Sequence, residues 1–498
     1  PVRASRARVG LRAGVPGARR ASGGRPGRHR AGSNITVMRR VADELMTRLA
    51  SLLTHVFFRH VEVEGADNLP RHGPLVVVAN HSNGLVDGLL LMTTLRRYPR
   101  FLGKSTLFRI LPLRPFLKLA GVVPVYRRSD SDSEHQGTDR NETTFRTSRQ
   151  LLARGGVVAV FPEGISHNEP ALQPLRTGAA RIALSAAADE GTDGLATVAV
   201  GLVYDAKATF RSRALVRVGV PRPVAPWVDA YQEDPRAAAR ALTDEMAEQL
   251  HEVVATYRSW QDAEMLAAIG DLVVTPVPGG DTSLAAAGAA SAAGSGTALA
   301  DRERVAVALA SVDLDGTAEG RKLKEAYRVY RRDLALMGVT DALVTARYGR
   351  HYQGALAWSM LKVGLALPPG LLGVAVHALP YQVMKRVGRL PRNESVKSTV
   401  KLLGCFALFS IEYLAIAEVV RRRRGIVAGA IAFLVGPLSG YATLRLSERA
   451  KSVGGLIEGA NVVRSRQMVL PTVLNHRAEV VRQACALVSC SPGMPASA

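Results

Sequence analysis

The sequence predicts an α/β domain with a largely parallel central sheet flanked by helices, followed by a helical, membrane-associated C-terminal region. Two observations lead to this prediction. Short apolar, β-branched runs alternate with helical segments in the first half of the chain, which is typical of a parallel sheet. Long apolar runs occupy the second half. The expected strands are 75–79, 122–126, 157–161, 197–203 and 214–219, and the expected helices are 85–96, 105–119, 143–154, 177–188 and 235–257.

The segment before the first strand divides into two parts. Residues 1–37 contain nine arginines and no Asp or Glu, are rich in Gly, Ala and Pro, and show no apolar periodicity. We therefore expect a disordered, Arg-rich extension over 1–37. Met38 is a sensible start of the native chain; the alternative is that the extension tethers the protein to an anionic surface. An amphipathic pattern begins at Met38 and predicts a helix over 38–66, which places the α/β domain at 38–270.

The second half of the chain begins with an Ala/Gly/Ser/Pro-rich stretch that is typical of a flexible linker. A charged helical pattern follows it, and strongly apolar runs come next. The expected order is a flexible linker at 271–300, a helical segment at 301–350, apolar membrane-associated helices at 351–450 and a C-terminal tail at 451–498.

Two of the apolar runs, 402–420 and 426–444, approach the roughly 20 residues that span a bilayer. Prolines interrupt a third run, 357–384, which is expected to be re-entrant or interfacial. Two glutamates weaken a simple crossing by the first run, because carboxylates inside a membrane are costly. The cluster Arg421–Arg424 is expected to stay cytosolic. We therefore expect membrane association and leave the number of crossings open.

Lysine and arginine outnumber the acidic residues by 65 to 42, which gives a formal net charge of +23. This balance allows a basic membrane-surface or nucleic-acid binding protein. Aromatic residues make up only 5% of the chain and do not interleave with the basic residues, which argues against nucleic acid as a partner. Three cysteines without metal-ligand spacing favour a reducing, cytosol-facing setting. The oligomeric state does not follow from the sequence.

A histidine and a carboxylate follow the first expected strand. His81 comes two residues after the run 75–79, and Asp87 lies six residues further on. On a regular helix this step rotates the side chain by roughly 600°, so the two can meet only if His81 lies in a turn and the helix begins near Gly84. The polar and small residues between them suit such a turn. Because α/β sheets bind ligands at the carboxyl ends of their strands, the pair is a candidate general base and orienting carboxylate.

Further polar residues follow the next strands. Arg127 directly follows the run 122–126, and Glu163 and Gly164 follow the run 157–161. Arg176 precedes a helix whose N-terminus could receive an anion, and Lys104 is a second candidate from its charge and position. Arginine forks suit a phosphate group. Since no Ser or Cys nucleophile elbow accompanies the His–Asp pair, the pattern favours direct deprotonation of a substrate hydroxyl. A metal-dependent hydrolase would need further ligands at workable spacing.

These blocks, in this order over about residues 65–220, resemble the phospholipid/glycerol acyltransferase family. That family usually has four residues between the histidine and the aspartate, whereas five stand between His81 and Asp87. The longer spacing resembles the branch that includes the fungal glycerol-3-phosphate/dihydroxyacetone-phosphate acyltransferases and their bacterial relatives. Ala199 stands where the family usually has proline. The blocks that are also similar to this branch are Phe-Pro-Glu-Gly-x-Ser-His at 161–167, Leu-Arg-Thr-Gly-Ala-Ala-Arg at 175–181 and Phe-Arg-Ser at 210–212.

The resemblance implies a role for each site residue. His81 would deprotonate the acceptor hydroxyl, which then attacks the thioester carbonyl of an acyl donor, and Asp87 would fix the imidazole tautomer and stabilise the imidazolium. Arg127, with Glu163 and Gly164, would hold the glycerol phosphate. Neither a metal nor a bound cofactor is implied; acyl-CoA or acyl carrier protein would be the co-substrate.

The expected function is that of a membrane-associated O-acyltransferase of glycerophospholipid biosynthesis, with its catalytic domain facing the cytoplasm. Glycerol 3-phosphate or dihydroxyacetone phosphate is the favoured acceptor because of the longer His–Asp spacing, and lysophosphatidate is the alternative. Each residue taken alone also has an ordinary interpretation: a loop histidine, a helix-start carboxylate, a solvated arginine. His167 is expected to be structural and bonded to the Glu163 loop, and Tyr126 and Tyr204 are expected to be packing residues.

Overall fold

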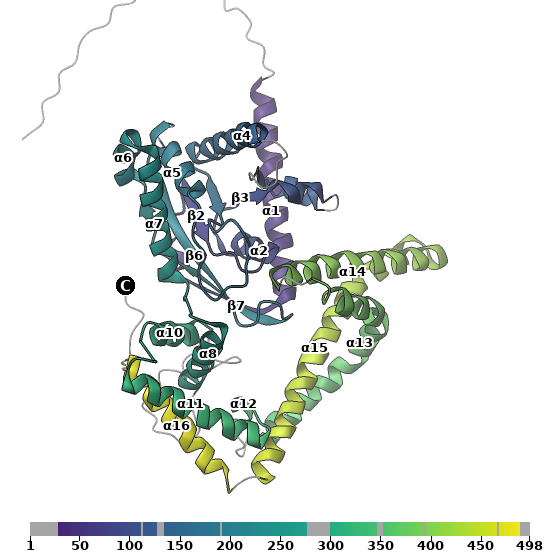
Figure 1. Ribbon diagram of the computed structural model, residues 1–498. Coiled ribbons are helices and arrows are strands. Elements are labelled where there is room, and N and C mark those ends of the chain that lie inside the picture. The colour runs from purple at the N-terminus through teal and green to yellow at the C-terminus, as the bar shows by residue number, and fades with distance from the viewer. Residues whose placement is uncertain are drawn as a thin grey trace, which may run out of the picture.

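The computed structural model describes residues 28–110, 113–126, 134–189, 192–275, 299–345, 352–391, 394–465 and 468–488. Its first half is a sheet covered by helices, and its second half is helical (Figure 1). The strands are β1 (Phe58–Glu64), β2 (Leu75–Ala79), β3 (Pro99–Lys104), β4 (Val123–Val125), β5 (Val157–Val160), β6 (Ala196–Tyr204), β7 (Ser212–Val218) and β8 (Arg222–Pro223). The helices around them are α1 (Arg28–Phe57), η1 (Ala66–Asn68), α2 (Leu85–Thr94), η2 (Ser105–Arg109), α3 (Arg114–Leu119), α4 (Glu134–Ala153), α5 (Gly178–Asp189), η4 (Ala225–Trp227), α6 (Val228–Glu233) and α7 (Pro235–Val253).

The strands are ordered β1-β7-β6-β2-β5-β3-β4, with β8 paired to β6. β2 pairs in parallel with both β5 and β6, and β3 pairs in parallel with β5 and β4. Only the pairings of β6 with β7 and with β8 are antiparallel among the described strands. The prediction of a largely parallel sheet is therefore confirmed. Because β2, β3 and β5 run in one direction, their carboxyl ends meet at one edge.

β2 forms the centre of the core, and all five of its residues are buried. Val77 packs on the face covered by α1 and α2, with residues such as Leu90. Val76 and Val78 pack on the other face, against residues of α5 and α7 such as Leu242. Helices on both faces explain why β2 is an uninterrupted apolar run rather than an alternating one.

The N-terminal helix differs from its prediction at both ends. α1 begins at Arg28, so the prediction of disorder is wrong for residues 28–37, while residues 1–27 lie outside the described part of the chain. The helix ends at Phe57 rather than at residue 66, because Phe58–Glu64 forms strand β1 beside β7. The last four residues of β1, Val61–Glu64, alternate between apolar and polar side chains, and a period of two fits a strand and not a helix.

The other expected strands and helices are present with shifted ends. The exceptions lie where the sequence contains prolines or charged residues. β3 was not expected, because its charged ends leave only a short apolar centre. The expected helix 105–119 is divided into η2 and α3, with Pro115 in the first turn of α3, where a proline is tolerated. α4 begins at Glu134, earlier than the helix expected over 143–154.

The C-terminal half contains a second hydrophobic core. Side chains of α8, α10, α11 and α16 meet there, among them Leu266, Leu309, Leu323 and Val480. α8 therefore packs with the C-terminal helices, and the α/β domain ends before it rather than at residue 270. The helices of this half are α8 (Trp260–Val274), α10 (Leu299–Ala310), α11 (Ala318–Met337), α12 (Asp341–Thr345), α13 (Tyr352–Val387), α14 (Glu394–Arg424), α15 (Ile426–Ser465) and α16 (Leu470–Val488).

Two predicted boundaries are corrected by these helices. The linker expected at 271–300 overlaps the end of α8 and the start of α10, and residues 276–298 lie outside the described part. The tail expected at 451–498 is wrong for most of its length, because α15 continues to Ser465 and α16 follows. Apolar residues spaced three or four apart along α16 give it a face for the second core.

Arg477 of α16 ties this core together. Its side chain is 1% exposed, its Nε donates a hydrogen bond to Asp341 Oδ1 at 2.7 Å, and its Nη2 donates to the carbonyl oxygens of Leu272 and Thr275 at 3.1 Å. A buried guanidinium that joins three segments indicates that α16 is an integral part of the helical region.

Replacing Arg477 by methionine is expected to lower the free energy of unfolding of this region by about 1–3 kcal/mol, because the half-buried Asp341 carboxylate and the carbonyl oxygens of Leu272 and Thr275 lose their donor. Chemical unfolding of the detergent-solubilised chain, followed by circular dichroism, measures the change. Arg482→Met is the matched control, because Arg482 is exposed and pairs with Glu479 on the surface of the same helix. Equal unfolding midpoints for the two variants would contradict this role for Arg477.

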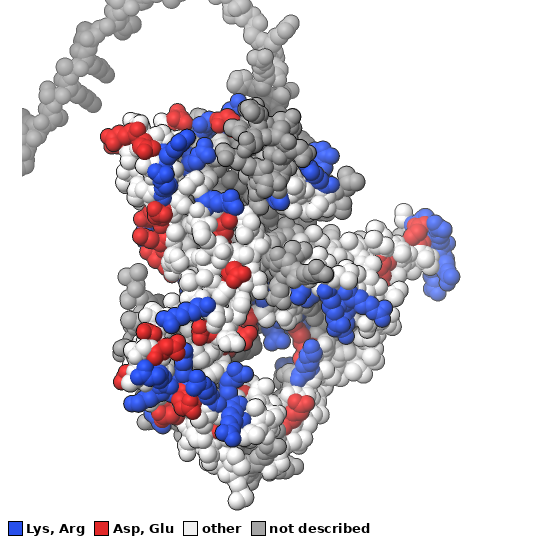
Figure 2. Space-filling model, viewed as in Figure 1, with Lys and Arg blue, Asp and Glu red and all other residues white. Residues whose placement is uncertain are grey.

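Within the described residues, two helices are long and apolar enough to cross a membrane, Lys397–Arg424 and Ile426–Gly455. A third crossing is available if the pair Leu356–Pro368 and Gly370–Val387, bent by 63°, forms one span. These findings support membrane association. In Figure 2 the exposed length of α14 is mostly white, with blue side chains near its start and at its far tip, where Arg421–Arg424 end the helix.

Both glutamates that weaken a crossing by α14 have partners. The His377 ring of α13 contacts Glu412 through Nδ1 at 3.0 Å, and His377 Nε2 contacts Ser439 Oγ of α15 at 3.1 Å. Glu418 accepts hydrogen bonds from Arg421 at 2.6 and 2.8 Å. These contacts lower the cost of the two carboxylates in an apolar helix and join α13, α14 and α15.

Candidate active site

His81 and Asp87 meet in the turn between β2 and α2. His81 Nδ1 lies 2.9 Å from Asp87 Oδ2, and the Asp87 side chain is fully buried while that of His81 is 20% exposed. The turn is possible because Gly84, immediately before α2, adopts a positive φ of 57°. The contact orients the imidazole so that Nε2 is the nitrogen that can accept a proton from a substrate.

Asp87 is held by three donors. Its Oδ2 also accepts the backbone N–H of Asn83 at 2.8 Å, and its Oδ1 accepts a hydrogen bond from the Tyr204 hydroxyl. Burial, reinforced by the Asp87 carboxylate, raises the pKa of Tyr204 well above its usual value. The hydroxyl therefore stays protonated near neutral pH and remains a donor to Asp87. Tyr204 is thus part of the His–Asp arrangement, and the prediction that it only packs is incomplete.

Glu163 lies beneath the backbone of His81. Its Oε1 accepts the His81 N–H at 2.7 Å, and its Oε2 accepts the Gln173 N–H at 2.9 Å and bonds to His167 Nε2. In return, the His167 N–H donates to the His81 carbonyl at 3.2 Å. The carboxylate is fully buried and shared among these groups. With its oxygens occupied in this way, Glu163 is suited to position the His81 loop and not to contact an anionic substrate.

The imidazole of His167 has a defined tautomer. Its Nδ1 accepts the backbone N–H of Glu169 at 3.1 Å, so the proton resides on Nε2, which faces Glu163. This agrees with the expectation that His167 is structural and bonded to the Glu163 loop. The loops after β2 and β5 are thereby joined through the buried Glu163 carboxylate and the backbone hydrogen bond from His167 to His81.

An aromatic surface supports the His81 ring. Phe161, directly after β5, stacks on the imidazole with ring centroids 4.2 Å apart and planes 15° apart. Phe161 also stacks with Phe101 of β3 at 6.3 Å. The stacking, together with the bond to Asp87, leaves the imidazole little freedom to rotate.

Three of the predicted phosphate-binding residues, Gly164, Arg176 and Lys104, lie at the same edge of the sheet. Gly164 has a φ of 74°, and a Cβ on it would stand 2.6 Å from Arg176 Nε, so the glycine makes room for that arginine. The Arg176 N–H donates to the Pro162 carbonyl at 2.8 Å, which fixes the arginine beside the end of β5. Lys104 is the last residue of β3. Arg127 lies outside the described residues, so its position relative to His81 stays a prediction.

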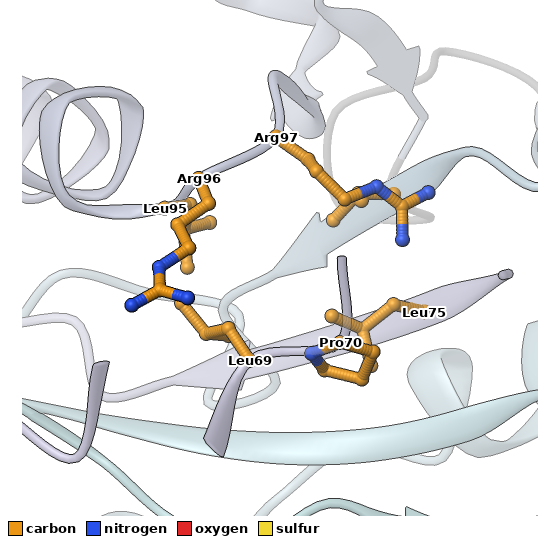
Figure 3. A pocket seen from close by; sticks show the side chains of 7 residues that line it. Leu69, Pro70, Leu75, Leu95, Arg96 and Arg97 are labelled. Carbon is orange, nitrogen blue, oxygen red and sulfur yellow. The ribbon is translucent and has the colours of Figure 1, made fainter. Parts of the chain in front are cut away.

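The pocket in Figure 3 lies at the opposite edge of the sheet. It is lined in part by Leu75 and Val157, the first residues of β2 and β5, and by Arg96 and Arg97 after α2. Arg97 donates to the carbonyl oxygens of Gly73 and Gly155. This arginine fastens the amino ends of the strands, and the pocket is separate from the His81 site.

Several residues that hold the site together were not among the predicted site residues. The Asn80 amide exchanges two hydrogen bonds with the backbone of Leu202, at 3.0 and 2.7 Å, and so fixes the end of β2 against β6. Ser166 Oγ accepts the Gly84 N–H at 3.1 Å. The position of Tyr204 at the end of the fourth expected strand was a signal that could have placed it beside Asp87.

Comparison with known proteins relates this geometry to a family. Residues 60–202 match the family model described as Acyltransferase. Glycerol-3-phosphate O-acyltransferase 2 of Saccharomyces cerevisiae is 25% identical over 306 residues, covering 41% of each chain. The sheep (Ovis aries) 1-acyl-sn-glycerol-3-phosphate acyltransferase alpha is 30% identical over 146 residues, covering 29% of this chain and 48% of that protein.

Among solved structures, the 1-acyl-sn-glycerophosphate (LPA) acyltransferase of Thermotoga maritima matches 43% of this chain and 80% of its own, with 19% identity and a TM-score of 0.31. The chain spans about two fifths of the length of the fungal relatives that it matches. The family match covers β2, β5 and nearly all of β6, and hence His81, Asp87 and Glu163. The part of the chain that contains the His81–Asp87 pair is therefore similar to acyltransferases.

Proposed function

We propose that this protein is a membrane-associated O-acyltransferase that transfers a fatty acyl group from acyl-CoA or acyl carrier protein to glycerol 3-phosphate or dihydroxyacetone phosphate. The observation that carries the proposal is the oriented His81–Asp87 pair at the carboxyl edge of the sheet, 2.9 Å apart and supported by Tyr204. The yeast relative, named for glycerol 3-phosphate, supports this acceptor.

The geometry supports a direct attack by the acceptor. His81 Nε2 takes the proton of the substrate hydroxyl, whose oxygen attacks the thioester carbonyl carbon. The tetrahedral intermediate collapses with cleavage of the carbon–sulfur bond, and the imidazolium returns the proton to the departing thiolate. The buried Asp87 carboxylate stabilises the imidazolium between these steps. The chemistry requires one base that is restored at the end of each turnover.

The acceptor phosphate is proposed to bind beside this pair. Arg127, Arg176 and Lys104 supply the positive charge, and Gly164 lets the Arg176 side chain lie across the loop after β5. Glu163 contributes by holding the backbone of His81 in place. Guanidinium groups would give the phosphate bidentate partners.

The catalytic domain is proposed to face the cytoplasm. Lys385 and Arg386 lie in the last turn of α13, and Arg389 follows the helix. This end of α13 lies close to α14, because a Cβ on Gly388 would stand 2.9 Å from the Lys401 side chain. Basic residues next to membrane segments favour the cytoplasmic side. Arg421–Arg424, at the opposite end of α14, weigh against a complete crossing by that helix. Protease accessibility of residues 276–298 in sealed vesicles of known orientation reports on which side the catalytic domain lies.

Lysophosphatidate is the second candidate acceptor, favoured by the sheep relative. In the deciding experiment, purified membranes that contain the protein are incubated with each acceptor in turn. The acyl donor is acyl-CoA or acylated acyl carrier protein with a labelled acyl group. We expect faster acylation of glycerol 3-phosphate or dihydroxyacetone phosphate than of lysophosphatidate. A preference for lysophosphatidate would overturn the acceptor assignment, and acylation of none of the three would overturn the proposed function.

A further inference from the structure

The start of α2 lacks the side chain that normally caps a helix. Gly84 occupies the N-cap position and has no hydroxyl, amide or carboxylate to accept the first free N–H groups. Two hydroxyls from distant segments take its place: Ser166 Oγ accepts the Gly84 N–H at 3.1 Å, and Thr399 Oγ1 accepts the Leu85 N–H at 3.2 Å. Thr399 lies 314 residues further along the chain, on α14.

This cap lies one turn from the catalytic carboxylate. Asp87 is the third residue of α2, after Leu85 and Val86. The position of its carboxylate therefore depends on an ordered first turn. If the first N–H groups lose their acceptors, that turn frays and the contact between Asp87 and His81 loosens.

The segment Ser398–Leu402 of α14, called the docking segment below, has three further attachments to the α/β domain. Ser398 Oγ donates to the Lys207 carbonyl at 2.9 Å, and Lys401 Nζ donates to the Ala208 carbonyl at 2.7 Å. Leu402 is 6% exposed and belongs to the core on the α1/α2 face of the sheet. A helix that is bonded and buried in this manner is fixed against the catalytic domain.

The docking segment also shares a partner with the active-site turn. The Lys207 carbonyl accepts a hydrogen bond from Asn83 Nδ2 at 3.1 Å as well as the one from Ser398. The backbone N–H of Asn83 in turn donates to Asp87. The docking segment is thus connected to Asp87 by two chains of hydrogen bonds. One runs from Thr399 to the first turn of α2, and the other runs from Ser398 through the Lys207 carbonyl to Asn83.

We infer that the docking segment of α14 is a positioning element of the active site, and that Thr399 supplies the helix cap that Gly84 lacks. This inference rests on the proposed function, because it assigns Thr399 to the same His81–Asp87 pair. It gives the C-terminal membrane region a role in catalysis beyond anchoring: transfer requires α14 seated on the catalytic domain.

Thr399→Val removes the hydroxyl and keeps the shape of the side chain. We expect kcat to fall by about five- to tenfold, the range expected for loss of a helix cap, while the KM for the acyl donor stays unchanged. Hydrogen exchange in the full chain should show faster exchange of the first amides of α2. Thr399→Ser, which restores the hydroxyl, should recover both properties.

Thr443→Val is the matched control. Thr443 Oγ1 donates to the Gly370 carbonyl between α15 and α13, so this variant loses a hydroxyl in the same helical bundle without touching α2. Wild-type kcat for Thr443→Val supports the inference. Equal losses in Thr443→Val and Thr399→Val, or no rescue by serine, would overturn it by showing a general effect of the bundle.

The outcomes also separate this inference from the function on which it rests. If His81→Ala abolishes transfer while Thr399→Val retains wild-type kcat and wild-type exchange in α2, the capping role is wrong and the function stands. If His81→Ala retains transfer, the proposed function is wrong, whatever the Thr399 variants do.

Discussion

Replacing His81 by alanine is expected to lower the rate of acyl transfer by about 10²–10⁴, the contribution of a well-placed general base. The physical reason is that no other base is aimed at the substrate position: within the described site, Asp87 is fully buried and Glu163 is occupied by backbone and His167 donors. Initial rates with labelled acyl donor, at saturating acceptor, measure the change in kcat.

The His81→Ala variant tests catalysis and not folding, because the conformation of the loop does not depend on the imidazole. The backbone of His81 is held by Glu163 and by the N–H of His167, and neither bond involves its side chain. We expect the thermal midpoint to change little. His72→Ala, an exposed loop histidine, is the matched control and should retain wild-type activity. A kcat for His81→Ala within twofold of the kcat for His72→Ala would contradict the proposed mechanism.

Replacing Asp87 by asparagine is expected to lower kcat by about 10²–10⁴, chiefly through loss of charge. An amide oxygen in the place of Oδ2 still accepts from His81 and Asn83, and the amide nitrogen faces Tyr204, whose hydroxyl can turn to accept. The tautomer and the turn therefore survive, while the stabilisation of the imidazolium is lost.

Tyr204→Phe provides the comparison for this variant. It removes one of the three donors to Asp87 and leaves the carboxylate in place, so we expect a loss of about tenfold or less. Single-turnover rates of acyl transfer compare the two variants at the chemical step, without a contribution from product release. Similar losses in Asp87→Asn and Tyr204→Phe would show that orientation, and not charge, is the contribution of Asp87.

The sequence predicted the central elements of the α/β domain well because their signals are local. β2 is a buried apolar run, and the polar turn with Gly84 ends it, so both the strand and the start of α2 at Leu85 follow from neighbouring residues. The same is true of the apolar helices near the C-terminus, where composition over a window suffices.

Elements whose stability comes from distant partners were missed. β1 contains several charged residues and only its last four residues alternate between apolar and polar, so its pairing with β7 is what makes it a strand. α16 was expected to be a tail, yet Val480 and Arg477 bury it against helices more than a hundred residues earlier in the chain. In both cases tertiary packing decided the structure and local propensity did not.

By itself, the sequence determined the chemistry of the site: a histidine and a carboxylate delivered by one strand–turn–helix unit, with a carboxylate and arginines following neighbouring strands. Only the tertiary structure decided what each group contacts. Glu163 holds the His81 backbone, Tyr204 donates to Asp87, and Thr399 caps α2. These bonds join residues 82 to 314 positions apart, and a hydrogen bond between such residues leaves no pattern in the local sequence.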